Sequence, residues 1–116
     1  MTADSPQIPQ LSPLLATERL LDGALLLDVR NDDERAAGFA PDSLFIPLPE
    51  LEQRADELDA QNEYVVVCRL GGRSQKAAEF LAAKGYTVSN LDGGMTAWAA
   101  AGLEVTTPDG GVGTII

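Results

Sequence analysis

The sequence predicts a small α/β domain with a mostly parallel central sheet flanked by helices on both sides. Short runs of strand-forming residues alternate along the chain with segments whose apolar residues recur at helical spacing. One run, residues 24–29, is apolar on both faces, as expected for a strand that helices cover on each side. The chain has 116 residues, 45% of them hydrophobic, which predicts a single domain with one sizeable core.

The first helix is predicted between a start signal and a stop signal. Ser12 and Pro13 are typical of the first positions of a helix, and Gly23 is typical of its end. After the apolar strand, three acidic residues at positions 32–34 predict the first turn of a short helix ending near Gly38. We interpret these three charges as helix-start charges because they suit the helix dipole.

A second short strand and a third helix follow. Residues 43–46 have the composition of a strand, and two prolines then introduce a helix with Leu51, Ala55 and Leu58 at helical spacing. The β-branched run at residues 64–67 predicts a buried strand.

The last third of the chain repeats the alternation. A helix is predicted at residues 73–84, ended by Gly85, followed by a strand at 86–91 and a helix at 95–101. Trp98 lies inside the last helix, and we expect it to belong to the core.

Both ends of the chain are predicted to be flexible tails around a domain of residues 8–105. Residues 1–7 are polar and contain proline, while residues 106–116 are rich in Gly, Thr, Pro and Asp. The N-terminal segment lacks the basic and apolar parts of a signal peptide, and no run of about 18 apolar residues occurs. We therefore expect a soluble, cytoplasmic protein.

The charge is unevenly distributed. The net charge is −10, which argues against nucleic acid and anionic membranes as partners. Residues 1–64 hold 14 of the 18 acidic groups, whereas three cations and no anion lie between residues 68 and 78. This local positive charge predicts a site for a small anion.

Cys68 is the only cysteine, and the chain has no histidine. An intramolecular disulfide, a multi-cysteine metal site and a Cys-His catalytic pair are therefore all excluded, and no cofactor is predicted. A lone cysteine at a strand end is more often a small buried hydrophobe than a nucleophile. Its surroundings reverse that preference here.

The loop after the buried strand is suited to hold a thiolate. Cys68 is followed by Arg69, Leu70, two glycines, Arg73 and Ser74, immediately before a predicted helix. Gly71 and Gly72 allow backbone amides to turn inward, and the helix start adds positive potential. Cations and helix starts lower the pKa of a thiol, so we predict a reactive Cys68.

Asp28 and Arg30 end the first strand at the edge of the sheet where the Cys68 loop also lies. They are candidates for supporting the site, and Asp28 is a candidate for orienting a loop arginine. We favour a structural ion pair because buried charges usually need partners.

These segments together resemble the rhodanese-like sulfurtransferase family. The resemblance covers roughly residues 8–105 and rests on several motifs in the expected order. They are Leu26-Leu27-Asp28-Val29-Arg30 with Glu34 and Gly38, Ile46-Pro47-Leu48, the segment from Val66 to Ser74, and Leu91-Asp92-Gly93-Gly94-Met95 with Trp98.

The resemblance implies a rhodanese-like domain and a function. Cys68 would accept sulfane sulfur from an anionic donor such as thiosulfate and pass it to cyanide or a thiol, including a thiol on a protein. Arg69 and Arg73 would bind the donor, and the amides of residues 70–74 would hold the persulfide. Ser74 is expected to cap the helix. No base is needed, and the lone cysteine requires an external acceptor.

The sequence departs from the family pattern in two places. The turn Gly38-Phe39-Ala40-Pro41-Asp42-Ser43 lacks the family's histidine, and Leu70 replaces a small polar residue. The geometry of that turn and the preference for a donor are therefore open.

Other functions remain alternatives. A cysteine phosphatase or arsenate reductase uses a similar loop, but with one more residue between cysteine and arginine than residues 68–73 provide. A persulfide carrier without turnover would use the same loop. A redox-sensing module, or a docking domain whose acidic first half binds a basic partner, is the remaining alternative.

Overall fold

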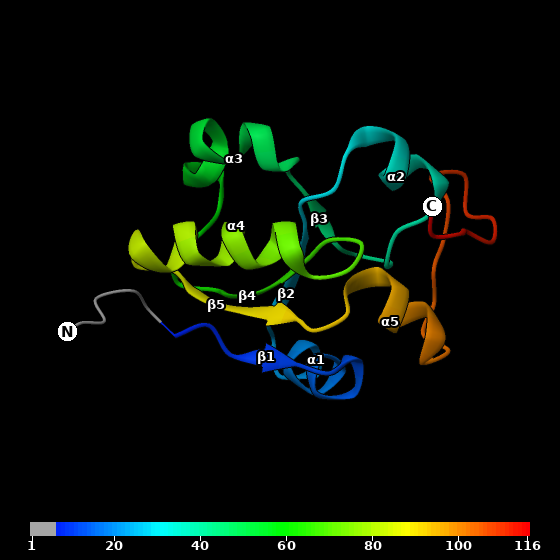
Figure 1. Ribbon diagram of the computed structural model, residues 1–116, viewed down its shortest axis with the longest axis horizontal. Coiled ribbons are helices and arrows are strands. Elements are labelled where there is room, and N and C mark those ends of the chain that lie inside the picture. The colour runs from blue at the N-terminus through cyan, green and yellow to red at the C-terminus, as the bar shows by residue number, and fades with distance from the viewer. Residues whose placement is uncertain (1–6) are drawn as a thin grey trace.

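A parallel sheet forms the centre of the molecule (Figure 1). The structure is a computed structural model that describes residues 7–116, so the expected tail at residues 1–7 lies almost wholly outside it. Within the described residues, five strands follow the order β1-β5-β4-β2-β3, and every neighbouring pair is parallel. The strands are β1 (Gln10–Leu11), β2 (Leu25–Asp28), β3 (Leu44–Phe45), β4 (Glu63–Val67) and β5 (Thr87–Leu91). The predicted α/β fold class is confirmed.

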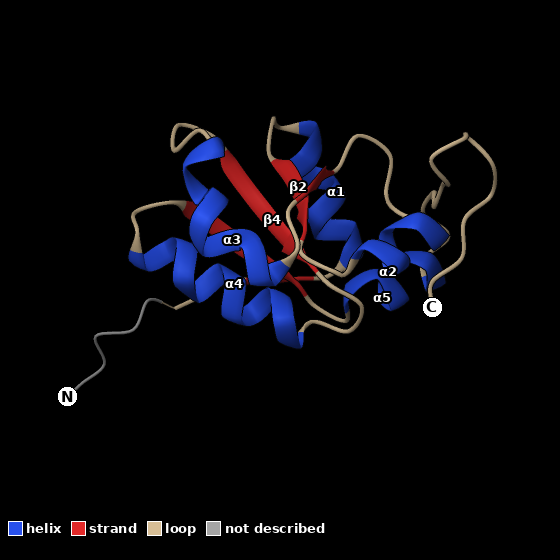
Figure 2. Ribbon diagram, turned by 90° about the horizontal axis from the view of Figure 1, so that it is seen from above, coloured by secondary structure: helices blue, strands red, loops and turns tan. Residues whose placement is uncertain are grey.

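Helices cover both faces of the sheet. They are α1 (Pro13–Leu21), α2 (Asp32–Ala37), α3 (Leu48–Arg54), α4 (Gly72–Ala83) and α5 (Gly94–Ala100), with a short 3-10 helix, η1 (Ala55–Glu57), after α3. Helices α3 and α4 lie on one side and α1 and α5 on the other, and Figure 2 shows α3 and α4 over β4. Strand β4 is therefore buried on both sides.

Two apolar clusters, one on each face, hold these layers together. Leu51, Ala55 and Leu58 are buried against the α4 face. The single helix predicted to carry them is shorter than expected, because Ala55 lies in η1 and Leu58 follows it in an extended conformation. Trp98 is buried against the opposite face, and its indole N–H donates to the carbonyl oxygen of Glu104 at 2.9 Å. The expectation that Trp98 belongs to the core is confirmed.

The N-terminal edge of the sheet was not predicted. Strand β1 has only two residues, and it pairs Gln10 with Asn90 and Leu11 with Leu91. The predicted first helix follows directly, and the Ser12 hydroxyl accepts a hydrogen bond from the amide of Leu15 at 3.3 Å. The start signal therefore acts as expected, while the strand before it carries no pattern of its own.

Residues 106–116 fold back onto the domain, although we expected a flexible tail. Phe39 and Thr106 exchange two backbone hydrogen bonds of 2.9 Å, and the amide of Thr114 donates to the carbonyl of Ala37 at 2.9 Å. Gly38 lacks the Cβ atom that would lie 2.6 Å from the Thr114 carbonyl oxygen. Backbone contacts of this kind leave no signature in side-chain composition.

The turn that lacks the family's histidine is held by Arg35. Its guanidinium donates to the hydroxyl of Ser43 at 2.7 Å and to the Ser43 carbonyl at 2.9 Å. It also lies 3.9 Å from the centre of the Phe39 ring. The guanidinium of Arg35 therefore stabilises this turn through contacts at both of its ends.

No helix among residues 7–116 is long and apolar enough to cross a bilayer.

Candidate functional site

Cys68 lies at the carboxyl end of β4, where the chain leaves the sheet for α4. Only 1% of its surface is exposed. Its sulfur accepts a hydrogen bond from the amide of Gly71 at 3.1 Å and lies 3.3 Å from the Ser74 hydroxyl oxygen. Gly71 has φ +113°, a conformation that favours glycine, and this turns the loop around the sulfur.

These contacts favour a thiolate. Burial raises the pKa of Cys68, but the Ser74 hydroxyl and the amides of Ser74, Gly71 and Leu70 lower it by more, so the pKa lies below its ordinary value. The loop thus combines low exposure with inward-directed donors, as the two glycines predicted.

A second strand-to-helix joint supports the loop from outside. At the start of α5, the amide of Met95 donates to the carbonyl of Cys68 at 2.8 Å, and that of Thr96 donates to the carbonyl of Arg69 at 3.1 Å. Gly94 makes this approach possible, because a Cβ atom there would lie 2.4 Å from the Cys68 carbonyl oxygen. This packing explains the Gly93-Gly94 motif in structural terms.

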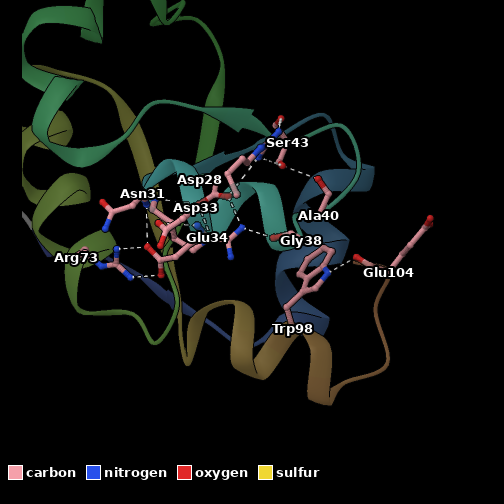
Figure 3. Close-up of polar contacts among 12 residues, drawn as sticks. Asp28, Asn31, Asp33, Glu34, Gly38, Ala40, Ser43, Arg73, Trp98 and Glu104 are labelled. Atoms are coloured by element: carbon pink, nitrogen blue, oxygen red, sulfur yellow. Dashed lines mark hydrogen bonds and ion pairs between the residues drawn. The ribbon is translucent and has the colours of Figure 1, made fainter. Parts of the chain in front are cut away.

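Arg73 is held by a carboxylate from α2. Its Nη1 and Nη2 donate to the two oxygens of Glu34 at 2.7 and 2.9 Å, and Figure 3 shows these side chains facing each other. Glu34 also accepts the amide of Asn31 at 2.9 Å, so it does contribute at the helix start. Our interpretation of Glu34 as only a helix-start charge missed its pairing with Arg73.

The Glu34–Arg73 pair predicts a stability change at acid pH. The Arg73 hydrogen bond, aided by the Asn31 amide and opposed by burial, lowers the pKa of Glu34 from 4.5 to about 2. A carboxyl whose pKa is depressed in the folded state stabilises the fold above its unfolded pKa, and this contribution is lost as pH falls towards 2. We expect Glu34→Gln to be destabilised relative to the wild type at pH 6, by an amount that shrinks between about pH 4.5 and 2.

Urea unfolding at a series of pH values measures this difference. Glu52→Gln is the matched control, because Glu52 is exposed and forms no ion pair with the described residues. A Glu34→Gln difference that stays constant across this range would contradict the assignment.

Asp28 and Arg30 form a buried ion pair at the end of β2. Arg30 Nε and Nη2 donate to the two Asp28 oxygens at 2.9 and 2.7 Å, and Nη2 also donates to the Gly38 carbonyl at 2.7 Å. Both side chains are almost fully buried, and Arg35 approaches Asp28 at 3.4 Å. The structural role that we favoured is the one these contacts support, since neither residue hydrogen-bonds a loop arginine.

The other loop residues differ in exposure. Arg69 and Leu70 are exposed, Leu70 to 60%, and Arg69 forms no ion pair with any described residue. Gly72 opens α4, whose N-cap is Gly71. The expectation that Ser74 caps this helix is wrong, because its hydroxyl is directed to Asn90 and Cys68.

Asn90 was missed from the sequence. It lies on β5, 3% exposed, and its Oδ1 accepts the Ser74 hydroxyl at 2.6 Å. An asparagine inside a predicted strand signals a polar partner in the core, but nothing in the sequence identifies Ser74 as that partner.

The buried thiol and the backbone amides around it lie in a part of the sequence that matches the model of a known protein family. Residues 12–101 match the model of the rhodanese-like domain. The chain belongs to the rhodanese-like domain family.

Relatives of this rhodanese-like domain include curated sulfurtransferases. It is 39% identical over 97 residues to a sulfurtransferase of Allochromatium vinosum, covering 81% of this chain and 91% of that protein. It is 32% identical over 95 residues to the thiosulfate sulfurtransferase GlpE of Ectopseudomonas mendocina, covering 81% and 87%. A sulfurtransferase-type transferase is therefore the activity class of this rhodanese-like domain.

A solved structure shows the same fold. The rhodanese-related protein of Thermoplasma volcanium superposes with a TM-score of 0.80 at 30% identity, covering 84% of this chain and 97% of that one.

Proposed function

We propose that this protein moves sulfane sulfur from an anionic donor such as thiosulfate to a thiophilic acceptor through a persulfide on Cys68. The proposal rests on the environment of Cys68. Its sulfur accepts a hydrogen bond from the Gly71 amide at 3.1 Å, and the pKa of its thiol is lowered. A thiolate at this position attacks sulfur without a general base.

The reaction has two displacement steps. In the first, the Cys68 thiolate attacks the outer sulfur of thiosulfate, a new S–S bond forms, and the old one breaks to release sulfite with the bonding electron pair. In the second, cyanide or a thiolate attacks the outer sulfur of the persulfide, and the Cys68 thiolate leaves. The chain has no second cysteine to resolve the persulfide, so turnover follows a ping-pong course.

The loop selects a small donor. Because Cys68 is only 1% exposed, a donor must bring a projecting sulfur atom to a buried thiol. Arg69, exposed and without an ion pair among the described residues, is free to attract the anion, and Arg73, which Glu34 holds in place, adds a second positive charge that acts on Cys68.

The acceptor contacts the exposed part of the Cys68 loop. Leu70 is 60% exposed beside the thiol, and an exposed leucine there suits an acceptor with an apolar surface, such as the region around a cysteine on another protein. This feature keeps a persulfide carrier as the second candidate function, since a carrier would load but not turn over with small acceptors.

A thiosulfate-to-cyanide assay tests the proposal, with thiocyanate as the product measured. We expect steady turnover, and loading without turnover would favour the carrier. Failure to hydrolyse an aryl phosphate is also expected, because the loop is shorter than that of the cysteine phosphatases.

Donor binding predicts unequal roles for two cations of α4. Both Arg73 and Lys76 carry one positive charge, but Arg73 interacts electrostatically with Cys68, and Lys76 is exposed almost one turn further along α4. Arg73→Ala should lower kcat/KM for thiosulfate about tenfold more than Lys76→Ala.

Both substitutions are made in a Glu34→Gln background, so that removing Arg73 leaves no unpaired carboxylate. Equal losses would mean that a diffuse positive field, and not contact with Arg73, draws the anion.

A further inference from the structure

Asn90 connects three parts of the loop's support. Its side chain is buried on β5 and contacts Ser74 on α4, Gly71 in the loop and Gln10 on β1. The proposed transfer of sulfur does not itself assign a role to this residue.

A backbone carbonyl fixes the orientation of the Asn90 amide. Nδ2 lies 3.2 Å from the carbonyl oxygen of Gly71, which can only accept a hydrogen bond. It also donates to Oε1 of Gln10 at 2.9 Å. Oδ1 must therefore face Ser74, and this oxygen can only accept.

The Ser74 hydroxyl has one proton and two neighbours that compete for it. Oγ lies 2.6 Å from Asn90 Oδ1 and 3.3 Å from the sulfur of Cys68. The shorter contact takes the proton, so Ser74 presents a lone pair to Cys68 while the thiol is protonated.

We propose that Asn90 is a positioning residue that competes with the Cys68 thiolate for the Ser74 proton and thereby weakens the stabilisation that Ser74 gives the thiolate. When Cys68 loses its proton, Ser74 can donate to the thiolate only by leaving Asn90 Oδ1, a buried acceptor, without a partner. In the persulfide the charge lies on the outer sulfur, so Ser74 can remain on Asn90. Asn90 therefore slows the release of the outer sulfur from the Cys68 persulfide, because that release forms the thiolate. This inference rests on the proposed function.

The charged residues near Cys68 are the same in the wild type and in the variants used to test this proposal. They are Arg69 in the loop, Arg73 on α4, Glu34 on α2, and Asp28 at the end of β2, which acts on Arg73. Substitutions at Asn90 and Ser74 change no formal charge.

The test is the pH profile of Cys68 alkylation by iodoacetamide. We expect Asn90→Ala to move the midpoint to lower pH and to raise the rate about fivefold on the acid limb, because Ser74 becomes free to donate to the thiolate. Asn90→Leu, which keeps more of the buried volume and has no acceptor, should do the same if the alanine variant folds poorly. Thr87→Ala, an uncharged and exposed position on the same strand β5, is the matched control and should leave the profile unchanged.

The Ser74→Ala background separates this account from a merely structural role. There the Asn90 substitution should no longer move the midpoint, because the shared proton is absent. An unchanged or raised midpoint in Asn90→Ala, an equal shift in the Ser74→Ala background, or an equal shift in Thr87→Ala would overturn the proposal.

Alkylation reports on the thiol whether or not the protein transfers sulfur. Failure of the proposed function, seen as no loading by thiosulfate, is therefore distinguishable from failure of the Asn90 assignment. If loading occurs, the persulfide of Asn90→Ala should also discharge to cyanide faster than that of the wild type, because a thiolate of lower pKa leaves more readily.

Discussion

Cys68→Ser should lose thiocyanate formation by about three orders of magnitude or more while keeping the fold. A serine hydroxyl is not ionised at neutral pH and attacks sulfur poorly, and the chain contains no other thiol to replace it. The fold is expected to persist, because the Gly71 amide and the Ser74 hydroxyl remain available to the smaller oxygen atom.

Steady-state turnover measures the loss, and urea unfolding of the same variant shows whether the fold is kept. Residual activity within tenfold of the wild type would place the reactive group elsewhere.

Gly94→Ala should destabilise the protein by about 3 kcal/mol or more. Gly94 has φ +60°, and a Cβ atom there would lie 2.4 Å from the Cys68 carbonyl oxygen and 2.5 Å from the Arg69 carbonyl oxygen. Either α5 or the Cys68 loop must move, and the Met95 and Thr96 hydrogen bonds to the loop are then lost.

Gly102→Ala is the matched control for this effect. Gly102 follows the other end of α5 with φ +80°, but apart from its two chain neighbours no atom of the described residues lies within 4 Å of its added Cβ atom. It therefore carries the backbone strain without the clash, and we expect a loss of about 1 kcal/mol. Urea unfolding compares the two, and equal losses would mean that the close approach to Cys68 does not constrain the loop.

Local signals predicted most of the fold. The Ser12 cap, the start of α3 after two prolines, and the apolar strands appear where expected, since each depends on neighbours in sequence. The third helix ends earlier than its apolar spacing predicted, because the chain passes into η1 and then into extended backbone at Leu58. Strand β1 has only two residues, too short for any periodic pattern, and it exists because it pairs with β5.

The loop around Cys68 was predicted from the sequence, but most of the contacts that support it were not. Cys68 and the glycines of its loop form one continuous motif, so their arrangement follows from local sequence. Ser74 was assigned by local preference to a helix cap, and a partner 16 residues away, Asn90, takes its hydroxyl instead. Glu34 reaches Arg73 across 39 residues, a separation at which no spacing rule operates.

The packing of residues 106–116 was likewise not predictable from local sequence. Their composition favours a tail, but the contacts of Thr106 and Thr114 with the chain around Gly38 are made by backbone groups, which every sequence possesses.

Intact-protein mass spectrometry after thiosulfate treatment tests most directly whether Cys68 carries the transferred sulfur. We predict that the wild type gains the mass of one sulfur atom and loses it when cyanide is added, while Cys68→Ser gains nothing. An unmodified wild-type protein, or equal loading of Cys68→Ser, would contradict the account.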